Sequence, residues 1–287
     1  MDAIPDCVSP DCNQWTAASY SLTCEREVVA ITGDMLRIDQ PLVHGLDVSF
    51  GGGEVYKINM ARLEEIGIEN MRLESTYSSS VGIDTDEDHA WTAVQFNNVQ
   101  HSWARSLECW HFTFSCVHTM KDSKYISTLN CTSYDPASII TGGRRYSFDT
   151  DGQMNLVSGC HSRNGRHDYV TGSKVPGPNV FHDSSAVMAH SDIGPHHRYA
   201  TGILWDTLRG FDARVWDRGN MGSGVRQSEE RSDELTTQSQ AAKTARAHTS
   251  VQDAPSLKPP RKCSLIIPTL FAIRFAHHSM GGLALLM

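Results

Sequence analysis

The strongest constraint on the fold is an internal repeat with a period of 30 residues. The dipeptide Thr-Gly occurs at positions 141–142, 171–172 and 201–202. Around the last two copies the match widens to seven residues, Arg166–Gly172 against His196–Gly202. Short apolar runs separated by turn residues surround these copies and are typical of strands. A repeat of this length predicts a solenoid, in which each coil of chain stacks on the coil before it.

A second, weaker repeat places cysteines at similar steps. Cys109, Cys131 and Cys160 each end a short run of the same type. In a parallel β-helix, equivalent residues of successive coils lie about 4.8 Å apart and form ladders. We therefore expect the three thiols to stack inside the solenoid as small apolar side chains. None of the 8 cysteines forms a Cys-x-x-Cys pair, so no structural zinc site is expected.

Composition divides the chain into three parts. Residues 1–27 are an N-terminal extension or cap, and residues 28–224 carry the strand patterns that predict the β-helix. Residues 225–287 begin with a low-complexity stretch, followed by prolines and an apolar end. Because this tail buries little surface, we expect it to be disordered or irregular.

Two segments within the central part allow local predictions. Val28–Ile31 and Met35–Ile38 flank a Gly-Asp turn and predict a β-hairpin. Met60–Leu73 contains good helix formers, but Gly67 interrupts it. We favour strands there, meeting at a turn near Glu69 and Asn70.

Charge and hydropathy exclude several classes of protein. The chain has 25 Lys and Arg against 33 Asp and Glu, a formal net charge of −8. This balance argues against a nucleic-acid partner, because it supplies no basic field. The apolar C-terminal stretch 264–287 is interrupted by Pro268 and Arg274, so we expect no stable membrane insertion. A monomer is expected.

Five motifs in residues 28–224 carry a resemblance to a known superfamily. They are IGIENMRLES (Ile66–Ser75), ITGGRRYSFD (Ile140–Asp149), CHSRNGRHDYVTG (Cys160–Gly172), PGPNVFHDSSA (Pro176–Ala186) and SDIGPHHRYATG (Ser191–Gly202). The stretch resembles right-handed parallel β-helix proteins of the pectin-lyase-like superfamily. The resemblance implies an all-β fold, a right-handed single-stranded parallel β-helix, and a carbohydrate-active protein.

The resemblance also carries expectations about location and completeness. Carbohydrate-active β-helices work mostly outside the cell, which implies an extracellular protein. Met1–Thr16 shows no signal-peptide pattern, however. After WDRGNMGSG (Trp216–Gly224) the chain enters the tail where further coils are expected. The final coils therefore look missing or replaced.

A concentration of histidines predicts where the chemistry lies. With coils of 30 residues, Arg166–Tyr169 would lie directly below His196–Tyr199 and form a strip of cations, imidazoles and phenols. Arginine binds a uronate carboxylate bidentately, and this neutralisation makes the C5 proton of the sugar more acidic. Histidine can remove that proton near neutral pH. The strip thus predicts a polysaccharide lyase that cleaves an acidic glycan by β-elimination.

The strip supplies specific candidates for each role. The base is expected to be His167 or His197, and the acid that protonates the leaving oxygen Tyr169 or Tyr199. The carboxylate clamp is expected to be Arg145 or Arg198. The expected substrate-binding residues together are Arg144, Arg145, Arg166, His196 and Arg198.

Three alternatives stay open. Solenoids stack like residues for structural reasons, so the strip fits a structural ladder in a non-catalytic carbohydrate-binding or surface module. A glycoside hydrolase would need a carboxylate pair from Asp168, Asp183 and Asp192. A metal would need His182, His196 or His197 with Asp183 or Asp192, but no ligand motif supports one. No cofactor is expected; calcium is conceivable, but the acidic run Asp84–Asp88 is interpreted as a solvated loop.

Overall fold

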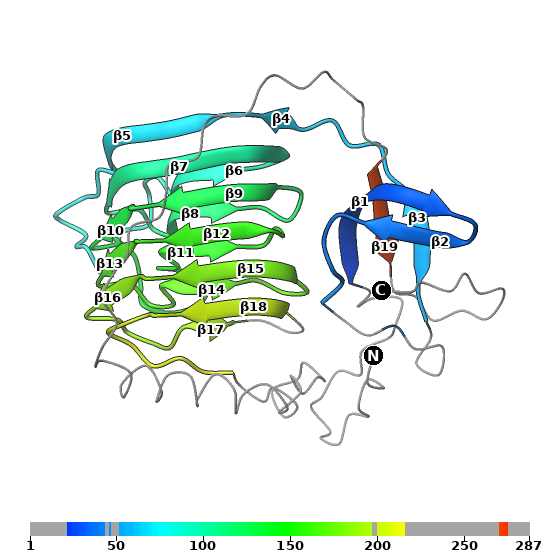
Figure 1. Cartoon of the computed structure of the whole chain (residues 1–287). Helices are drawn as coiled ribbons and strands as arrows, with labels where there is room; N and C mark the ends of the chain where they lie inside the picture. Colours follow the sequence, from blue (N-terminus) through cyan, green and yellow to red (C-terminus); the bar gives the residue numbers. More distant parts are fainter. Residues whose placement is uncertain (1–21, 44–45, 47–51, 197–199, 216–269, 275–287) are drawn as a thin grey trace, which may run out of the picture.

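The computed structural model describes residues 22–43, 46, 52–196, 200–215 and 270–274. Within these ranges the regular elements are all strands, so the predicted all-β fold is confirmed (Figure 1). Across the same ranges, no helix has the length and apolar character needed to cross a membrane. Of the predicted tail, only strand β19 (Leu270–Arg274) falls inside the described ranges.

Most strands run parallel in two sheets. The larger sheet has ten strands in the order β16-β13-β10-β7-β9-β12-β15-β18, with β4 and β5 also paired to β7. Because β7 is the longest of these strands, it pairs with both β9 and β10 and so joins two faces of the solenoid. The strands are β4 (Leu63–Glu64), β5 (Gly67–Glu74), β7 (Val99–Trp110), β9 (Lys124–Leu129), β10 (Thr132–Tyr134), β12 (Asn155–Ser158), β13 (His161–Arg163), β15 (Pro176–His182), β16 (Ser185–Val187) and β18 (Thr201–Asp206).

The smaller parallel sheet has five strands in the order β17-β14-β11-β8-β6. They are β6 (Thr92–Phe96), β8 (Ser115–Thr119), β11 (Phe148–Thr150), β14 (Tyr169–Thr171) and β17 (Gly194–Pro195). Both sheets contribute to one apolar core, in which Phe148 and Tyr169 of the smaller sheet meet Phe181 of the larger one. The rings of Phe148 and Tyr169 stack with centroids 5.4 Å apart.

Strands of successive coils pair in register, which confirms a parallel β-helix. Val157 in β12 pairs with Thr128 on one side and with Phe181 on the other. The spacings are 29 and 24 positions, so the coils are unequal in length. Each coil therefore satisfies the backbone hydrogen bonds of its neighbours, while the turns absorb the difference in length.

The expected 30-residue register is wrong. Thr171 in β14 pairs with Pro195, 24 positions further along the chain. Thr201 instead lies in β18 of the larger sheet, opposite Pro176. The two Thr-Gly copies thus occupy different sheets and are not vertical neighbours. The seven-residue match could not indicate the register, because the register depends on how many residues each turn contains.

A residue with positive φ marks one corner of every coil. Non-glycine residues adopt this left-handed conformation rarely, and asparagine adopts it more readily than most. The corners stack through backbone hydrogen bonds, since Asn130 donates to Ser158 O and Gly159 donates to His182 O. The φ values are 54° at Asn70, 53° at Ser106, 52° at Asn130, 66° at Gly159, 40° at Asp183 and 54° at Thr207.

The cysteine ladder is confirmed for two of its three members. Cys131 and Cys160 are buried free thiols, and the strands that begin just after them pair in register. Cys109 is also in the core, but it pairs across coils with Ser133 and forms a disulfide with Cys116. In the strand register, Cys109 therefore lies two residues away from the position that faces Cys131.

An asparagine ladder links the neighbouring parallel strands β12 and β15. Asn155 and Asn179 are paired in register and both are buried. The Asn179 side chain accepts a hydrogen bond from Asn155 N and donates one to Gly152 O, each 2.9 Å long. The Asn155 side chain in turn accepts from Ile126 N. These amides satisfy backbone groups that the strands leave unpaired.

A separate antiparallel sheet of four strands lies beside the solenoid (Figure 1). Its order is β2-β1-β19-β3, with β1 at Thr23–Thr32, β2 at Met35–Ile38 and β3 at Glu54–Lys57. The predicted hairpin is confirmed as β1 and β2, but it belongs to this sheet and not to the coils. Met60–Leu73 contains β4 and most of β5, so strands are confirmed there, with the Asn70 corner where a turn was expected.

Buried ion pairs join the antiparallel sheet to the solenoid. The Glu25 carboxylate accepts two hydrogen bonds of 2.6 Å from Arg62 and lies 2.5 Å from Lys124 Nζ. Burial by itself raises the pKa of Glu25, but the hydrogen bonds from Arg62 and Lys124 hold it below its ordinary value. Arg26 is fully buried and donates to Gly177 O at 2.9 Å. Glu25 is thus ion-paired, while the buried Arg26 guanidinium is hydrogen-bonded to neutral acceptors such as Gly177 O and Gln153 Oε1.

The asparagine ladder gives a test of how the coils are held. Replacing Asn179 with Ala should lower the free energy of unfolding by about 2–4 kcal/mol, because Asn155 N–H and Gly152 O would lose their buried partners. Urea unfolding followed by circular dichroism measures this change. Gln95→Ala, at an exposed position of β6, is the control and should change stability by less than about 0.5 kcal/mol. Equal effects for the two variants would contradict a structural role for the ladder.

Candidate functional site

Polar and aromatic side chains gather on the outer face of the five-stranded sheet. Alternation along the strands sends Val117 and Phe148 into the core and the next residues, His118 and Asp149, to the opposite face. His118 and Asp149 are direct cross-strand neighbours. We name this surface the short-sheet face; its members are Phe114, His118, Tyr146, Asp149, Asp151, His167 and His196.

Rings form a continuous row on the short-sheet face. The Tyr146 ring lies 5.3 Å from Phe114, 5.3 Å from His167 and 5.2 Å from His196, measured between centroids. The imidazoles of His167 and His196 are 4.1 Å apart. Phe114 contacts His118 edge-on at 5.2 Å. The face thus brings three imidazoles and one phenol together, with Tyr146 5% and His167 4% exposed.

The backbone fixes the tautomer of His167. Its Nδ1 lies 2.6 Å from the backbone oxygen of Asp192 and 3.8 Å from that residue's carboxylate. Because a carbonyl oxygen can only accept, Nδ1 carries the proton and Nε2 is the basic nitrogen of the neutral ring. The backbone of Asp192 therefore fixes the orientation of the ring.

A second cluster lies further along the same face. His118 Nε2 lies 3.1 Å from Asp151 Oδ2 and 3.6 Å from Asp149 Oδ2. Burial lowers the pKa of His118, but the hydrogen bond to Asp151 and the charge of Asp149 raise it above its ordinary value. Burial, with the nearby charge of Asp151, raises the pKa of Asp149 to about 8. Among the described residues, this is the one group of three or more whose ligand atoms lie close enough to hold a metal ion.

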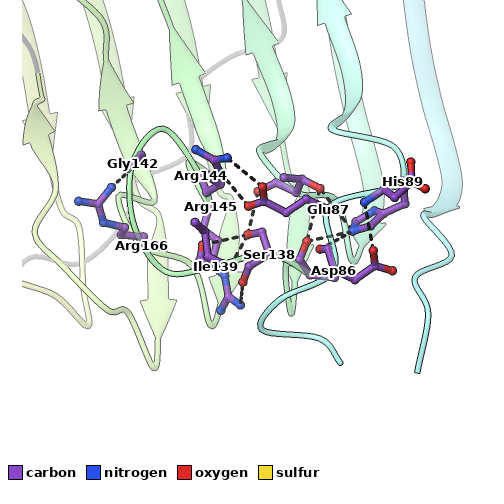
Figure 2. Close-up of polar contacts among 12 residues, drawn as sticks. Asp86, Glu87, His89, Ser138, Ile139, Gly142, Arg144, Arg145 and Arg166 are labelled. Atoms are coloured by element: carbon purple, nitrogen blue, oxygen red, sulfur yellow. Dashed lines mark hydrogen bonds and ion pairs between the residues drawn. The ribbon is translucent and has the colours of Figure 1, made fainter. Parts of the chain in front are cut away.

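Two of the arginines expected to bind substrate are held by the chain's own carboxylates (Figure 2). Arg144 binds Glu87 bidentately, with both hydrogen bonds 2.8 Å long. Arg145 is fully buried and donates to Asp84 Oδ1 at 2.8 Å and to Ser138 O at 2.5 Å. The hydrogen bond from Arg144 lowers the pKa of Glu87, although burial opposes it. Two carboxylates of the acidic run, Asp84 and Glu87, are therefore ion-paired to the solenoid, while Asp84 and Asp88 stay exposed as expected for a solvated loop.

Arg166 has a different environment. Its guanidinium donates a hydrogen bond to Gly142 O (Figure 2). Unlike Arg144 and Arg145, it makes no ion pair with any carboxylate in the part of the chain that the structure describes. Arg166 is thus the one of these three arginines whose charge is not already matched by a described carboxylate.

Tyr169 lies in the core and not on the face. Its side chain is 0% exposed, and its hydroxyl donates to Cys160 O and Ser185 O at 3.0 and 2.8 Å. Burial raises its pKa well above the ordinary value. A glycan has no access to this hydroxyl, so the structure gives Tyr169 the packing role that was the alternative. The other expected residues His197, Arg198 and Tyr199 lie outside the described residues.

The carboxylates expected for a hydrolase occupy three different environments. Asp168 is fully buried and accepts a 2.6 Å hydrogen bond from Ser147 Oγ. Burial raises the pKa of Asp168 to about 6, although hydrogen bonds from two serines oppose this. Asp183 is exposed at a corner and pairs with Arg209, while Asp192 lies beside His167.

His118, Asp149 and Asp151 were not predicted from the sequence. A signal was present, because Asp149 and Asp151 are two positions apart on a strand and its continuation. Residues with this spacing point to the same face of a sheet. His118 could not be added, since nothing in the sequence indicates that its strand pairs with β11.

Comparisons with known protein families, with curated proteins and with solved structures found no match to this chain. The parallel solenoid therefore stands on the strand pairing alone. The curled parallel sheets are compatible with the β-helix that the quoted motifs resemble, and none of the comparisons supports a particular superfamily.

The buried arginine gives a prediction that separates packing from substrate binding. Arg145→Met should lower the free energy of unfolding by about 3 kcal/mol, because it leaves the Ser138 and Asn164 carbonyls without their donors. Arg166→Ala should change it by less than about 0.5 kcal/mol. Thermal unfolding of both variants measures the difference. An unchanged stability for Arg145→Met would refute the structural role.

Asp168 predicts a pH dependence of stability. The folded protein binds the Asp168 proton more tightly than the unfolded chain does, so this contribution is complete below about pH 4 and is lost as the pH rises through 6. The loss amounts to about 3 kcal/mol. Asp168→Asn should remove this pH dependence. The stability of the variant relative to the wild type should therefore rise as the pH is raised from 4 through 6. Urea titrations at both pH values measure the change; parallel profiles would show that Asp168 does not titrate as described.

Proposed function

We propose that this protein is a carbohydrate-active β-helix protein of the pectin-lyase-like type that cleaves a uronate-containing glycan by β-elimination. The observation that carries the proposal is the pair of imidazoles of His167 and His196, 4.1 Å apart and both in contact with the Tyr146 ring. The reaction requires a base and an acid on one face, and this cluster supplies candidates for both.

The proposed steps assign one proton transfer to each group. His167, through Nε2, or His196 removes the C5 proton of the uronate. The electron pair forms the C4=C5 double bond, and the bond from C4 to the glycosidic oxygen breaks. Tyr146 donates its proton to the departing oxygen and takes the acid role that the sequence had given to Tyr169 or Tyr199.

The substrate carboxylate needs a positive charge beside it. Arg166 supports this role best, because Arg144 and Arg145 are already matched by Glu87 and Asp84. A guanidinium can bind the carboxylate and lower the pKa of the adjacent C5–H. Arg198 is proposed as a further clamp.

The proposal includes an extracellular location. The Cys109–Cys116 disulfide supports it, because such bonds persist in oxidising compartments. A carbohydrate-binding module without catalysis is the second candidate. The buried position of Tyr169 favours it, since part of the repeated strip packs the core and does not face a ligand.

An assay on several acidic glycans tests the proposal. Pectate, alginate and glucuronan are incubated with the full chain while the ultraviolet absorbance of new C4=C5 bonds is followed. His167→Ala and Tyr146→Phe should each lower turnover at least about 100-fold, because each removes a proton-transfer group. His182→Ala, an exposed imidazole of the larger sheet, is the matched control and should keep full activity.

Other outcomes would replace the proposal with a specific alternative. New reducing ends without absorbance would indicate a hydrolase. Binding without either signal would indicate the carbohydrate-binding module. Neither cleavage nor binding with any glycan of the panel would contradict a carbohydrate-active protein.

A further inference from the structure

We infer that His118, Asp149 and Asp151 form a binding site for one divalent first-row transition-metal ion. The inference does not depend on the proposed glycan chemistry. Its geometric basis is that one nitrogen and two carboxylate oxygens from these residues all lie within 4.8 Å of one another.

The strand register brings the three ligands together. His118 in β8 pairs directly with Asp149 in β11, and Asp151 follows two residues later on the same face. The distances of 3.1 and 3.6 Å from His118 Nε2 to the two carboxylates resemble those between the ligands of one ion. A cation bound at about 2.0–2.2 Å holds its ligands about 3–3.5 Å apart. Small side-chain movements therefore suffice to bind it.

A buried oxygen without a partner points independently to a ligand. Asp149 Oδ1 is inaccessible to solvent and has no hydrogen-bond partner among the residues that the structure describes, and the side chain of Asp149 is 7% exposed. A second carboxylate, Asp151, lies nearby. Two carboxylates and one imidazole leave negative charge in excess when both acids are ionised, which is unfavourable at a buried site. A bound cation would compensate this charge and coordinate the oxygen.

Neighbouring residues position the ligands. Gly172, just after β14, packs against the Asp151 carboxylate so closely that a Cβ atom there would overlap its oxygen Oδ1. The Phe114 ring restrains the His118 imidazole edge-on. Restraints of this kind around the ligands are typical of metal sites. They also give the Gly of the second Thr-Gly copy a local role.

The donor set selects the class of ion. Calcium and magnesium prefer sites made of oxygen alone, whereas an imidazole nitrogen favours zinc, iron, nickel or copper. Two hard carboxylates beside one imidazole suit Zn²⁺ or Mn²⁺. Asp151 is the most accessible ligand, with 29% of its side chain exposed, so an ion can enter from solvent and keep positions open for water.

Calorimetric titration of the full chain tests the site. The protein is stripped with a chelator and titrated with Zn²⁺ and, separately, with Mn²⁺. One ion should bind per chain with at least one of the two metals. Asp149→Asn and Asp151→Asn should each weaken binding by more than about 100-fold, because each removes a ligand. Asp206→Asn is the matched control, because Asp206 also lies beside an imidazole, that of His182, but on the exposed larger sheet.

Two further measurements keep the inference open to refutation if a ligand variant does not fold. Gly172→Ala should weaken binding about 10- to 100-fold by displacing the Asp151 carboxylate. Co²⁺ bound to the wild type should give a visible absorption spectrum typical of mixed nitrogen and oxygen ligands. Absence of saturable binding to the wild type, or equal binding to the wild type, Gly172→Ala and Asp206→Asn, would overturn the site.

Discussion

Parallel hydrogen bonding between successive coils is the constraint on which the rest of this structure depends. The backbone groups of one coil find their partners in the coils on either side, so pairing is kept even where the loops differ in length. Corner residues of positive φ, such as Asn130 beside Gly159, keep the turns aligned from coil to coil. Once the register is set, strand alternation decides which side chains meet.

The same alternation gives each short strand two tasks. In β11, Phe148 packs the core while Asp149 faces outward, next to His118 of the neighbouring strand. The rigid core therefore holds ionisable groups close together that would repel one another, or make no contact, in a flexible chain. The raised pKa of Asp149 is the energetic consequence of collecting such groups at a half-buried surface.

Local patterns predicted the architecture well but not the vertical neighbours. Apolar alternation predicted the strands and the internal repeat predicted a parallel solenoid, although the 30-residue register of that repeat was wrong. The pairing of Thr171 with Pro195 was not predictable, since it depends on how many residues each turn uses. The ion pair between Arg145 and Asp84 was not predictable either, because nothing near Arg145 in the sequence indicates that Asp84 contacts it. His167 and His196 of the candidate site were both named from the sequence, but their contact was not predicted, because the expected register placed His167 below His197.

The buried Arg26 has a consequence for the order in which the chain acquires its structure. Its guanidinium bonds to the carbonyl of Gly177, a residue that leaves the ribosome 151 positions later. The first strand can thus pair with β2 early, but the solenoid residues that Arg26 contacts are synthesised only later. A solenoid could in principle grow stepwise from its first coil. Here the segment around Arg26 reaches its final contacts only after the coil that contains Gly177 has been synthesised.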